Sequence, residues 1–310
     1  MSIQGVNPMI EKITGKYDKL KKLCQRLEWW PEMSPYEVID YMYSNDISSQ
    51  NLVDILNAYS LNPQYVFDRI YKGKDSVVFF EKPQNVKIDR ETICFITCFN
   101  KKVELDEMNA WIDRLDIPDG MAIEKKAIEG AKSMCAGYND AMHSSKAKYK
   151  VYLHQDVRIL NPYFIYEIVD CFNRNSQVGL IGMLGALYVP NSGVMWQADR
   201  VGAVVHSVSN EESIAETFDE RVAVEGDCQV KLIDGFLMAT CVDLNWRADI
   251  FKGWDFYDVS QSLEFIKKGY DVVVPYQKNT WCLHDFGSIN WSGYEENRVL
   301  FVDEYLNDYI

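Results

Sequence analysis

The spacing of apolar residues predicts helices in the first quarter of the chain. Over residues 8–30, apolar side chains recur every three or four positions, which is typical of an amphipathic helix. Ser34-Pro35-Tyr36-Glu37 combines a capping serine with a proline at the first helical position, and Asn62-Pro63 repeats the start signal. We therefore expect an all-helical domain over residues 1–75. Because it carries no catalytic constellation, we assign it to packing, oligomerisation or partner docking.

The pattern changes after an expected linker at residues 76–90. Short apolar runs then alternate with stretches of helical periodicity, as expected for strands that cross over helices in a largely parallel sheet. The predicted strands are 93–99, 150–153, 178–183 and 272–275, and the predicted helices include 129–144 and 163–173. We expect residues 91–310 to form one α/β domain.

Polar residues directly after the apolar runs indicate where a ligand would bind. In open α/β sheets, ligands bind beyond the carboxyl ends of the strands. The run 149–153 leads straight into His154-Gln155-Asp156, and the first strand leads into Asn100. A carboxylate at Asp156 could hold Mg²⁺ or Mn²⁺, with phosphate oxygens completing the coordination shell. Alternatively, Asp156 caps the helix that follows Asn161-Pro162.

Two later stretches carry further candidate chemistry. Asp255 and Asp258 follow a Gly-Trp turn near the start of a predicted helix, where exposed N–H groups also stabilise a carboxylate that has no catalytic role. His284 lies beside Asp285 just past the last predicted strand. This histidine could be a metal ligand, a phosphate donor or a structural residue.

Composition and charge exclude several classes of function. Acidic residues outnumber basic ones by 46 to 32, so the surface field repels nucleic acid and anionic lipid. No apolar run approaches the length of about 20 residues that spans a bilayer, and no leader-like segment is present. The eight cysteines contain no C-x-x-C pair, which predicts reduced thiols and a cytoplasmic location. The glycines at 179, 182 and 185 do not match a dinucleotide-binding motif.

The order of these segments resembles the nucleotide-sugar glycosyltransferases of the GT-A fold. The similarity lies in the branch related to family 2 that carries His-Gln-Asp where most members carry Asp-x-Asp, so that His154 stands where the first acid usually is. The resemblance implies a Rossmann-like, mostly parallel sheet flanked by helices. The processive-synthase motif Gln-x-x-Arg-Trp is missing, which favours a non-processive enzyme. The matching segments are Ile93–Asn100, Ser133–Asn139, YLHQDV at 152–157, DGFLMAT at 234–240, GWDFYDVS at 253–260 and WCLHD at 281–285.

The resemblance also implies roles for individual side chains. Asp156 matches the last acid of the Asp-x-Asp motif, which binds Mn²⁺ or Mg²⁺ on the donor diphosphate, and His284 matches a late histidine of the same site. Asp258 matches the catalytic base of inverting members, with Tyr257 in place of the glutamate that usually precedes it. Asp234 falls in the loop that lies beside the acceptor.

The donor nucleotide is expected at the end of the first strand and along the next helix. The implied reaction is metal-assisted, inverting transfer of a hexose-type sugar from a UDP donor to a glycan, protein or lipid-linked acceptor. A nucleotide-sugar hydrolase and a non-catalytic nucleotide- or glycan-binding module remain alternatives. Each candidate donor-binding residue could instead be an ordinary polar position of a helix or, for the tryptophan, part of the core. The candidates for donor binding are Thr97, Asn100, Glu129, Ser133, Asn139, Gln155, Asp156, Asp234 and Trp281.

Overall fold

The computed structural model describes residues 80–88, 90–208, 226–278, 280–286 and 291–306. The chain divides into two compact units, residues 1–80 with 101–113, and residues 81–100 with 114–310. Helix α6, Lys102–Ile112, belongs to the first unit. The helical domain predicted over residues 1–75 lies outside the described residues, so its boundaries stay a prediction.

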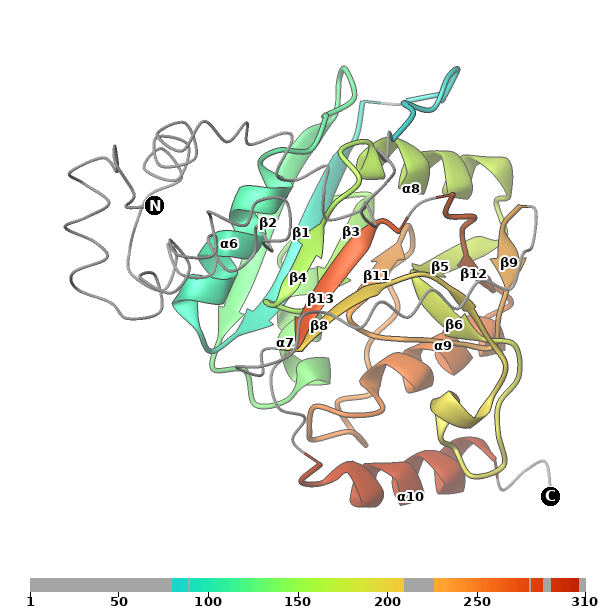
Figure 1. Cartoon of the computed structure of the whole chain (residues 1–310). Helices are drawn as coiled ribbons and strands as arrows, with labels where there is room; N and C mark the ends of the chain where they lie inside the picture. Colours follow the sequence, from blue (N-terminus) through green and yellow to red (C-terminus); the bar gives the residue numbers. More distant parts are fainter. Residues whose placement is uncertain (1–79, 89, 209–225, 279, 287–290, 307–310) are drawn as a thin grey trace, which may run out of the picture. The chain divides into compact units, whose positions relative to one another are not determined.

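A seven-stranded sheet forms the centre of the second unit (Figure 1). Its strand order is β2-β1-β3-β11-β5-β12-β9. The pairing directions make β2, β1, β3, β5 and β12 run one way and β11 and β9 the other, which confirms the predicted α/β class with a mostly parallel sheet. The strands are β1 Thr92–Phe99, β2 Ala122–Glu129, β3 Tyr149–Leu153, β5 Val178–Gly182, β9 Cys228–Gln229, β11 Leu237–Thr240 and β12 Asp271–Val274.

Different helices cover the two faces of this sheet. Alternation along β1 turns Cys94, Ile96 and Cys98 to the face that packs against α7, Met134–His143, and α9, Tyr257–Lys267. On the other face, the ring of Tyr149 stacks on Phe172 of helix α8, with 5.7 Å between the ring centroids. Helix α8 spans Phe164–Arg174 and lies on the opposite side of the sheet from α9 (Figure 1).

Two small three-stranded sheets flank the central one. The first has the order β10-β6-β7 and the second the order β4-β13-β8. The second sheet places β13 beside β4, the strand that begins immediately after Asp156. The strands are β4 Val157–Ile159, β6 Leu184–Ala186, β7 Arg200–Gly202, β8 Val205–Val208, β10 Leu232–Ile233 and β13 Cys282–Phe286.

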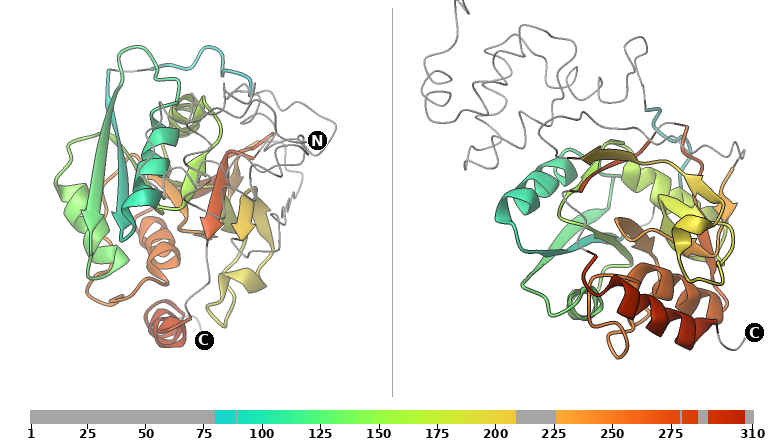
Figure 2. Two further views of the ribbon diagram at one scale, coloured as in Figure 1. Left: turned by 60° about the vertical axis from the view of Figure 1, so that its left-hand side comes forward. Right: turned by 60° about the horizontal axis from the view of Figure 1, so that its bottom comes forward.

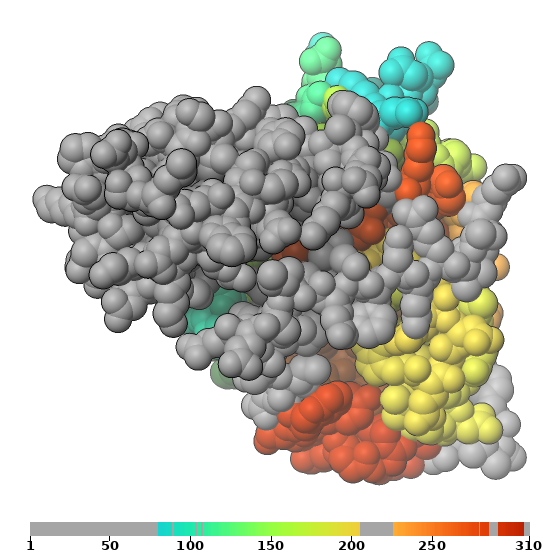
Figure 3. All heavy atoms as spheres, viewed as in Figure 1, coloured from blue at the N-terminus to red at the C-terminus, as the bar shows by residue number. Residues whose placement is uncertain are grey.

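The last helix, α10, Tyr294–Tyr305, joins two parts of the unit. It lies against α9 (Figure 2). Arg247 bonds both Glu264 of α9 and Glu304 of α10. Helix α10 also contacts the segment around the 3₁₀ turn η1, Met195–Gln197, because Arg298 donates to the carbonyl of Ser192 at 2.7 Å. Figure 3 shows the two surfaces side by side, α10 in red and the η1 segment in yellow. Within the described residues, no helix has the length and apolar character to cross a bilayer.

The structure corrects the prediction of one helix over residues 129–144. Residues 122–129 form strand β2, paired in parallel with β1, and helix α7 begins only at Met134. In β2 no side chain is fully buried, and exposed and partly buried positions are mixed, because this strand is at the edge of the sheet. Its lysines and glutamates hide the apolar run by which the other strands were recognised.

Candidate active site

Three loop segments meet at one end of the central sheet, the edge along which its parallel strands finish. Strands β1 and β3 are parallel and end there, so Asn100 and His154 leave the sheet on the same side. Strand β11 runs the other way and begins at this edge, since Leu237 pairs with Leu153. The backbone N–H of His154 donates to the carbonyl of Phe236 at 3.0 Å, which joins the two loops.

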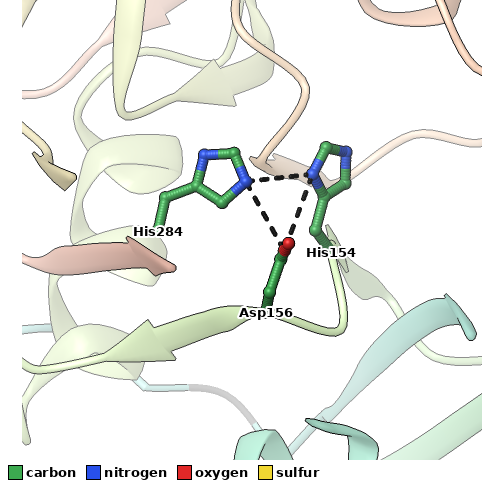
Figure 4. Close-up of side chains that lie close together, drawn as sticks. All are labelled: His154, Asp156 and His284. Carbon is green, nitrogen blue, oxygen red and sulfur yellow. Dashed lines mark hydrogen bonds and ion pairs between the residues drawn. The ribbon is translucent and has the colours of Figure 1, made fainter. Parts of the chain in front are cut away.

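His154, Asp156 and His284 point toward one another at this edge (Figure 4). Nε2 of His284 lies 3.4 Å from Oδ1 of Asp156 and 3.4 Å from Nδ1 of His154. Nδ1 of His154 lies 3.9 Å from the same carboxylate oxygen. His284 reaches the group from β13, which pairs with β4 so that His284 lies opposite Val157. Its ring stacks on Phe236, with centroids 5.3 Å apart.

These three atoms fit the requirements of a divalent cation. Ligands about 2.1 Å from an ion lie about 3–3.5 Å from one another, close to the separations observed here. Oδ1 of Asp156 is buried, and among the described residues it has no hydrogen bond of ordinary geometry. A bound cation would satisfy this oxygen and the two ring nitrogens that face it. His154 would then be the third ligand, although the sequence identified it only as a departure from the acidic motif.

The electrostatics favour the metal-binding forms of His154 and Asp156. Burial, with the nearby His284, lowers the pKa of His154 to about 4, so its imidazole is neutral near pH 7. Burial alone would raise the pKa of Asp156, but the interactions with His284, His154 and Arg158 outweigh it and hold that pKa well below its usual range. A neutral imidazole and an ionised carboxylate are the forms that bind metals.

A tyrosine at the start of α9 contacts the far side of His154. The hydroxyl of Tyr257 lies 2.5 Å from Nε2 of His154, and the tyrosine ring is buried. The preceding residue, Phe256, has φ of +62°, an uncommon conformation for a large side chain and one that costs about 1–3 kcal/mol. The surrounding structure therefore holds the start of this helix in place.

Asp258, the next residue, is fixed by two backbone N–H groups. Its Oδ1 accepts from Val259 and its Oδ2 from Gly235, both at 2.8 Å. Burial, together with the negative charge of Asp234, raises the pKa of Asp258 to about 7. Oδ1 of Asp234 accepts from the N–H of Phe236 at 3.1 Å, and burial raises its pKa as well. Asp234 thus lies in the loop before β11, whose Phe236 carbonyl bonds His154, and Asp258 at the start of α9 is tied to the same loop through Gly235.

Asn100 and Gln155 bind each other. The Gln155 side chain accepts from the backbone N–H of Asn100 at 3.0 Å and donates to its side-chain oxygen at 2.8 Å. This pair of bonds ties the ends of β1 and β3 together beside the metal-binding group. Both residues were predicted to face the donor. Their position beside the metal-binding group is compatible with that role, which stays a prediction.

Three other predicted donor-binding residues bond backbone groups through their side chains. Ser133 caps α7 by accepting from the N–H of Ala136, and both amide atoms of Asn139 bond the backbone of Trp246. The hydroxyl of Thr97 is buried and donates to the carbonyl of Cys98.

Two further candidates are at opposite extremes of exposure. Glu129 is exposed at the end of β2, where it pairs with Phe99, the residue before Asn100. Trp281 is 3% exposed and packs edge-on against Phe164, which leaves no open ring face for a sugar.

Arg158 was missed by the sequence reasoning. It is buried in β4 and donates to the carbonyl of Gln155 at 3.0 Å, directly behind the turn that carries Asp156. The available signal was an arginine between Val157 and Ile159, where an apolar strand residue is expected. A buried cation needs compensating partners, and the acidic turn supplies them.

Comparison with protein families gives one match that covers most of the chain. The model of the Glycosyltransferase like family matches residues 94–305, which include every site residue described above. No curated protein matches the sequence.

Solved structures give distant matches. The mannosyltransferase PcManGT from Pyrobaculum calidifontis, solved with GDP-Man and Mn²⁺, matches with 12% identity and a TM-score of 0.42, over 70% of this chain and 64% of its own. GalNAc-T7, solved with UDP, GalNAc and Mn²⁺, matches with 9% identity and a TM-score of 0.49, over 73% of this chain and 49% of its own. S. aureus TarS, solved with UDP, matches with 9% identity and a TM-score of 0.45, over 70% of this chain and 66% of its own. The chain thus spans between about half and two thirds of the length of these proteins.

Proposed function

Because the chain belongs to the Glycosyltransferase like family, we propose that it transfers a hexose-type sugar from a nucleoside diphosphate donor, UDP, to an acceptor hydroxyl. The transfer is metal-assisted and inverts the anomeric centre. The observation that supports it is the convergence of the group His154, Asp156 and His284 with Asp258 at one edge of the sheet. The free thiols of all seven cysteines in the described ranges support a cytoplasmic location.

His154, Asp156 and His284 would hold a divalent cation at the site of the donor diphosphate. When bound, the cation offsets the negative charge that develops as the diphosphate leaves. Asp156 supplies the single negative charge of this group, and the two imidazoles supply neutral nitrogen ligands. Asn100 and Gln155 brace the turn, so that the ligands keep their spacing when the donor arrives.

Asp258 removes the proton from the acceptor hydroxyl. Each of its oxygens accepts one backbone N–H and keeps a second lone pair for that proton. A pKa of about 7 suits a general base that works near neutral pH. Because Asp258 takes a proton and does not attack the sugar, the acceptor enters opposite the leaving group, which accounts for inversion.

The ligand set favours Mn²⁺ over Mg²⁺. Mg²⁺ prefers oxygen ligands, whereas imidazole nitrogen suits transition metals. Two of the three ligands here are imidazoles. We therefore expect Mn²⁺ to support the reaction at concentrations at which Mg²⁺ gives little activity.

The test is incubation of the full chain with Mn²⁺, UDP- or GDP-linked hexoses, and glycan, peptide or lipid-linked acceptors. We expect release of nucleoside diphosphate that depends on acceptor and metal, and a glycosylated product whose anomeric configuration is opposite to that of the donor. Free sugar as the only product would indicate a hydrolase. The proposal would be contradicted if no nucleotide sugar gave turnover and none bound in calorimetry.

A further inference from the structure

We propose that Tyr257 is a positioning residue that holds His154 with Nδ1 directed at the metal and Nε2–H directed at the tyrosine oxygen. The inference rests on the metal site of the proposed function. It extends that site by one residue which occupies the place of an acid in the resembling enzymes and which does not itself reach the metal.

The geometry divides the two nitrogens of His154 between two partners. Nδ1 faces Nε2 of His284 and Oδ1 of Asp156, while Nε2 lies 2.5 Å from the hydroxyl of Tyr257. A neutral imidazole carries one proton, and the nitrogen that binds a metal must carry none. With the metal on Nδ1, the proton is on Nε2, so the tyrosine oxygen is its acceptor.

The opposite arrangement excludes metal binding by His154. If the hydroxyl of Tyr257 donated to Nε2, the proton of the neutral ring would be on Nδ1. That N–H would point at the place where the cation must be, between His284 and Asp156. Only one direction of this hydrogen bond is therefore compatible with the complete ligand set. Outer-shell acceptors of this kind orient metal-bound histidines and raise their basicity.

The position of the hydroxyl is fixed from the opposite side by Gly235. A Cβ atom at Gly235 would overlap the hydroxyl and the adjoining ring carbons of Tyr257, so only glycine allows this approach. The ring also packs among Tyr138 and Trp246, with centroid distances of 5.9 and 6.1 Å. The oxygen has little freedom to leave Nε2 of His154.

The same contacts connect the metal ligands with the base. The N–H of Gly235 donates to Asp258, the residue that follows Tyr257 on α9. A single backbone segment thus holds the outer-shell tyrosine and the base at a fixed separation. Moving the start of α9 would disturb the orientation of His154 and the position of the base together.

The first test is metal binding without a donor, which does not depend on any transferase activity. Tyr257→Phe removes the oxygen and keeps the ring, so we expect the Mn²⁺ affinity, measured by electron paramagnetic resonance titration, to fall about 10–100-fold. The matched control is Tyr138→Phe, which removes a buried hydroxyl from the same aromatic cluster. That hydroxyl has no hydrogen-bond partner among the described residues, so the affinity should stay within about twofold of wild type.

The second test is NMR of the histidine side chains in the Zn²⁺-loaded protein. The sequence contains four histidines, so single substitutions can assign their signals. In wild type and Tyr138→Phe, we expect a downfield Nε2 proton on His154 that exchanges slowly with water. In Tyr257→Phe the signal should move upfield and exchange fast, an effect that a purely structural role would not produce.

Two outcomes would overturn the inference. One is a proton on Nδ1 of His154 in the metal-loaded wild type, which can be observed even if the Tyr257 variant does not fold. The other is an Mn²⁺ affinity in Tyr257→Phe equal to wild type while Asp156→Asn weakens it. Either result leaves the proposed transferase activity intact. Absence of turnover, with Mn²⁺ affinity lowered as expected, would instead contradict the proposed function and leave the role of Tyr257 standing.

Discussion

Asp156 at the end of β3 and Asp258 at the start of α9 are carboxylates of the same site in opposite environments. The pKa of Asp156 lies well below its usual range, because two histidines and Arg158 outweigh the effect of burial. The pKa of Asp258 rises to about 7, because burial and the charge of Asp234 act in the same direction. One acid is therefore always charged near neutral pH, and the other can exchange a proton.

The difference shows that surroundings, not residue type, divide the work between the two acids. Pairs of acids whose pKa values are driven apart commonly separate into a permanently charged group and a proton-transfer group. Asp156 has cationic or ligand-type neighbours and suits a metal. The carboxylate of Asp258 accepts from two backbone N–H groups and is close to another acid, Asp234, so it suits proton transfer. Each of the two carboxylates can be removed separately by substitution.

The largest effect is expected from Asp258→Asn. Loss of a general base lowers rates by about 10²–10⁴-fold, so kcat should fall by that amount while the affinity for the donor, measured by calorimetry, changes little. The amide group would also face the N–H of either Gly235 or Val259, so thermal unfolding must confirm that the variant is folded.

A matched control for this substitution is Asp255→Asn. Asp255 is partly buried three residues earlier in the same segment, and burial raises its pKa too. Its rate should stay within about threefold of wild type, because ordinary partly exposed substitutions have small effects. A rate for Asp258→Asn within tenfold of wild type would remove this residue from the role of base.

A smaller but still large effect is expected from Asp156→Asn on the metal side. The substitution removes the only carboxylate among the three ligands, so Mn²⁺ affinity should fall by more than the roughly 10–100-fold that the loss of an outer-shell partner costs. Asp170→Asn, on α8 and paired with Arg174, should leave the affinity unchanged. Unaltered Mn²⁺ binding in Asp156→Asn would place the metal elsewhere in the protein.

Buried strands could be predicted from the sequence, and exposed or very short strands could not. The buried strands β1, β3, β5 and β12 were recognised because they are apolar runs, and the α/β class that followed from them is confirmed. The resemblance to glycosyltransferases, which rested on the order of the motif segments, is confirmed by the family match. Strand β2 was not recognised, because three consecutive charged residues, Glu124 to Lys126, interrupt its apolar positions and leave neither an apolar run nor a regular alternation. Short strands such as β11 gave no signal of their own, since their pairing depends on distant segments.

The candidate site was predicted unevenly for a similar reason. Asp156, Asp258 and His284 stood out as polar residues at element ends, where the chain order allowed them to be matched. The contributions of His154 and Tyr257 depend on which ring nitrogen faces which partner, and that is set by packing around Gly235. Ser133 and Asn139 were predicted as donor contacts; in the structure Ser133 caps α7 and Asn139 bonds the backbone of Trp246, and their contact with a donor stays a prediction.

The smallest expected effect, and the one that probes the comparison most finely, is the pH dependence of kcat/KM. Asp258 must be deprotonated to act as a base, so kcat/KM should rise with pH, about tenfold per unit below a midpoint near pH 7. Asp234→Asn removes the neighbouring negative charge but keeps an oxygen that can accept from Phe236. Losing that charge makes ionisation of Asp258 easier, so the midpoint should move to lower pH and activity at pH 6 should increase several-fold.

A bound cation also favours the ionised carboxylate and would lower the midpoint in both proteins. The informative measurement is therefore the difference between wild type and Asp234→Asn at the same Mn²⁺ concentration. The residual activity of Asp258→Asn should lack this rise with pH altogether. A midpoint that moves upward in Asp234→Asn, or a rise that persists without Asp258, would mean that another group carries the proton. The contrast between the two acids would then reflect only their packing.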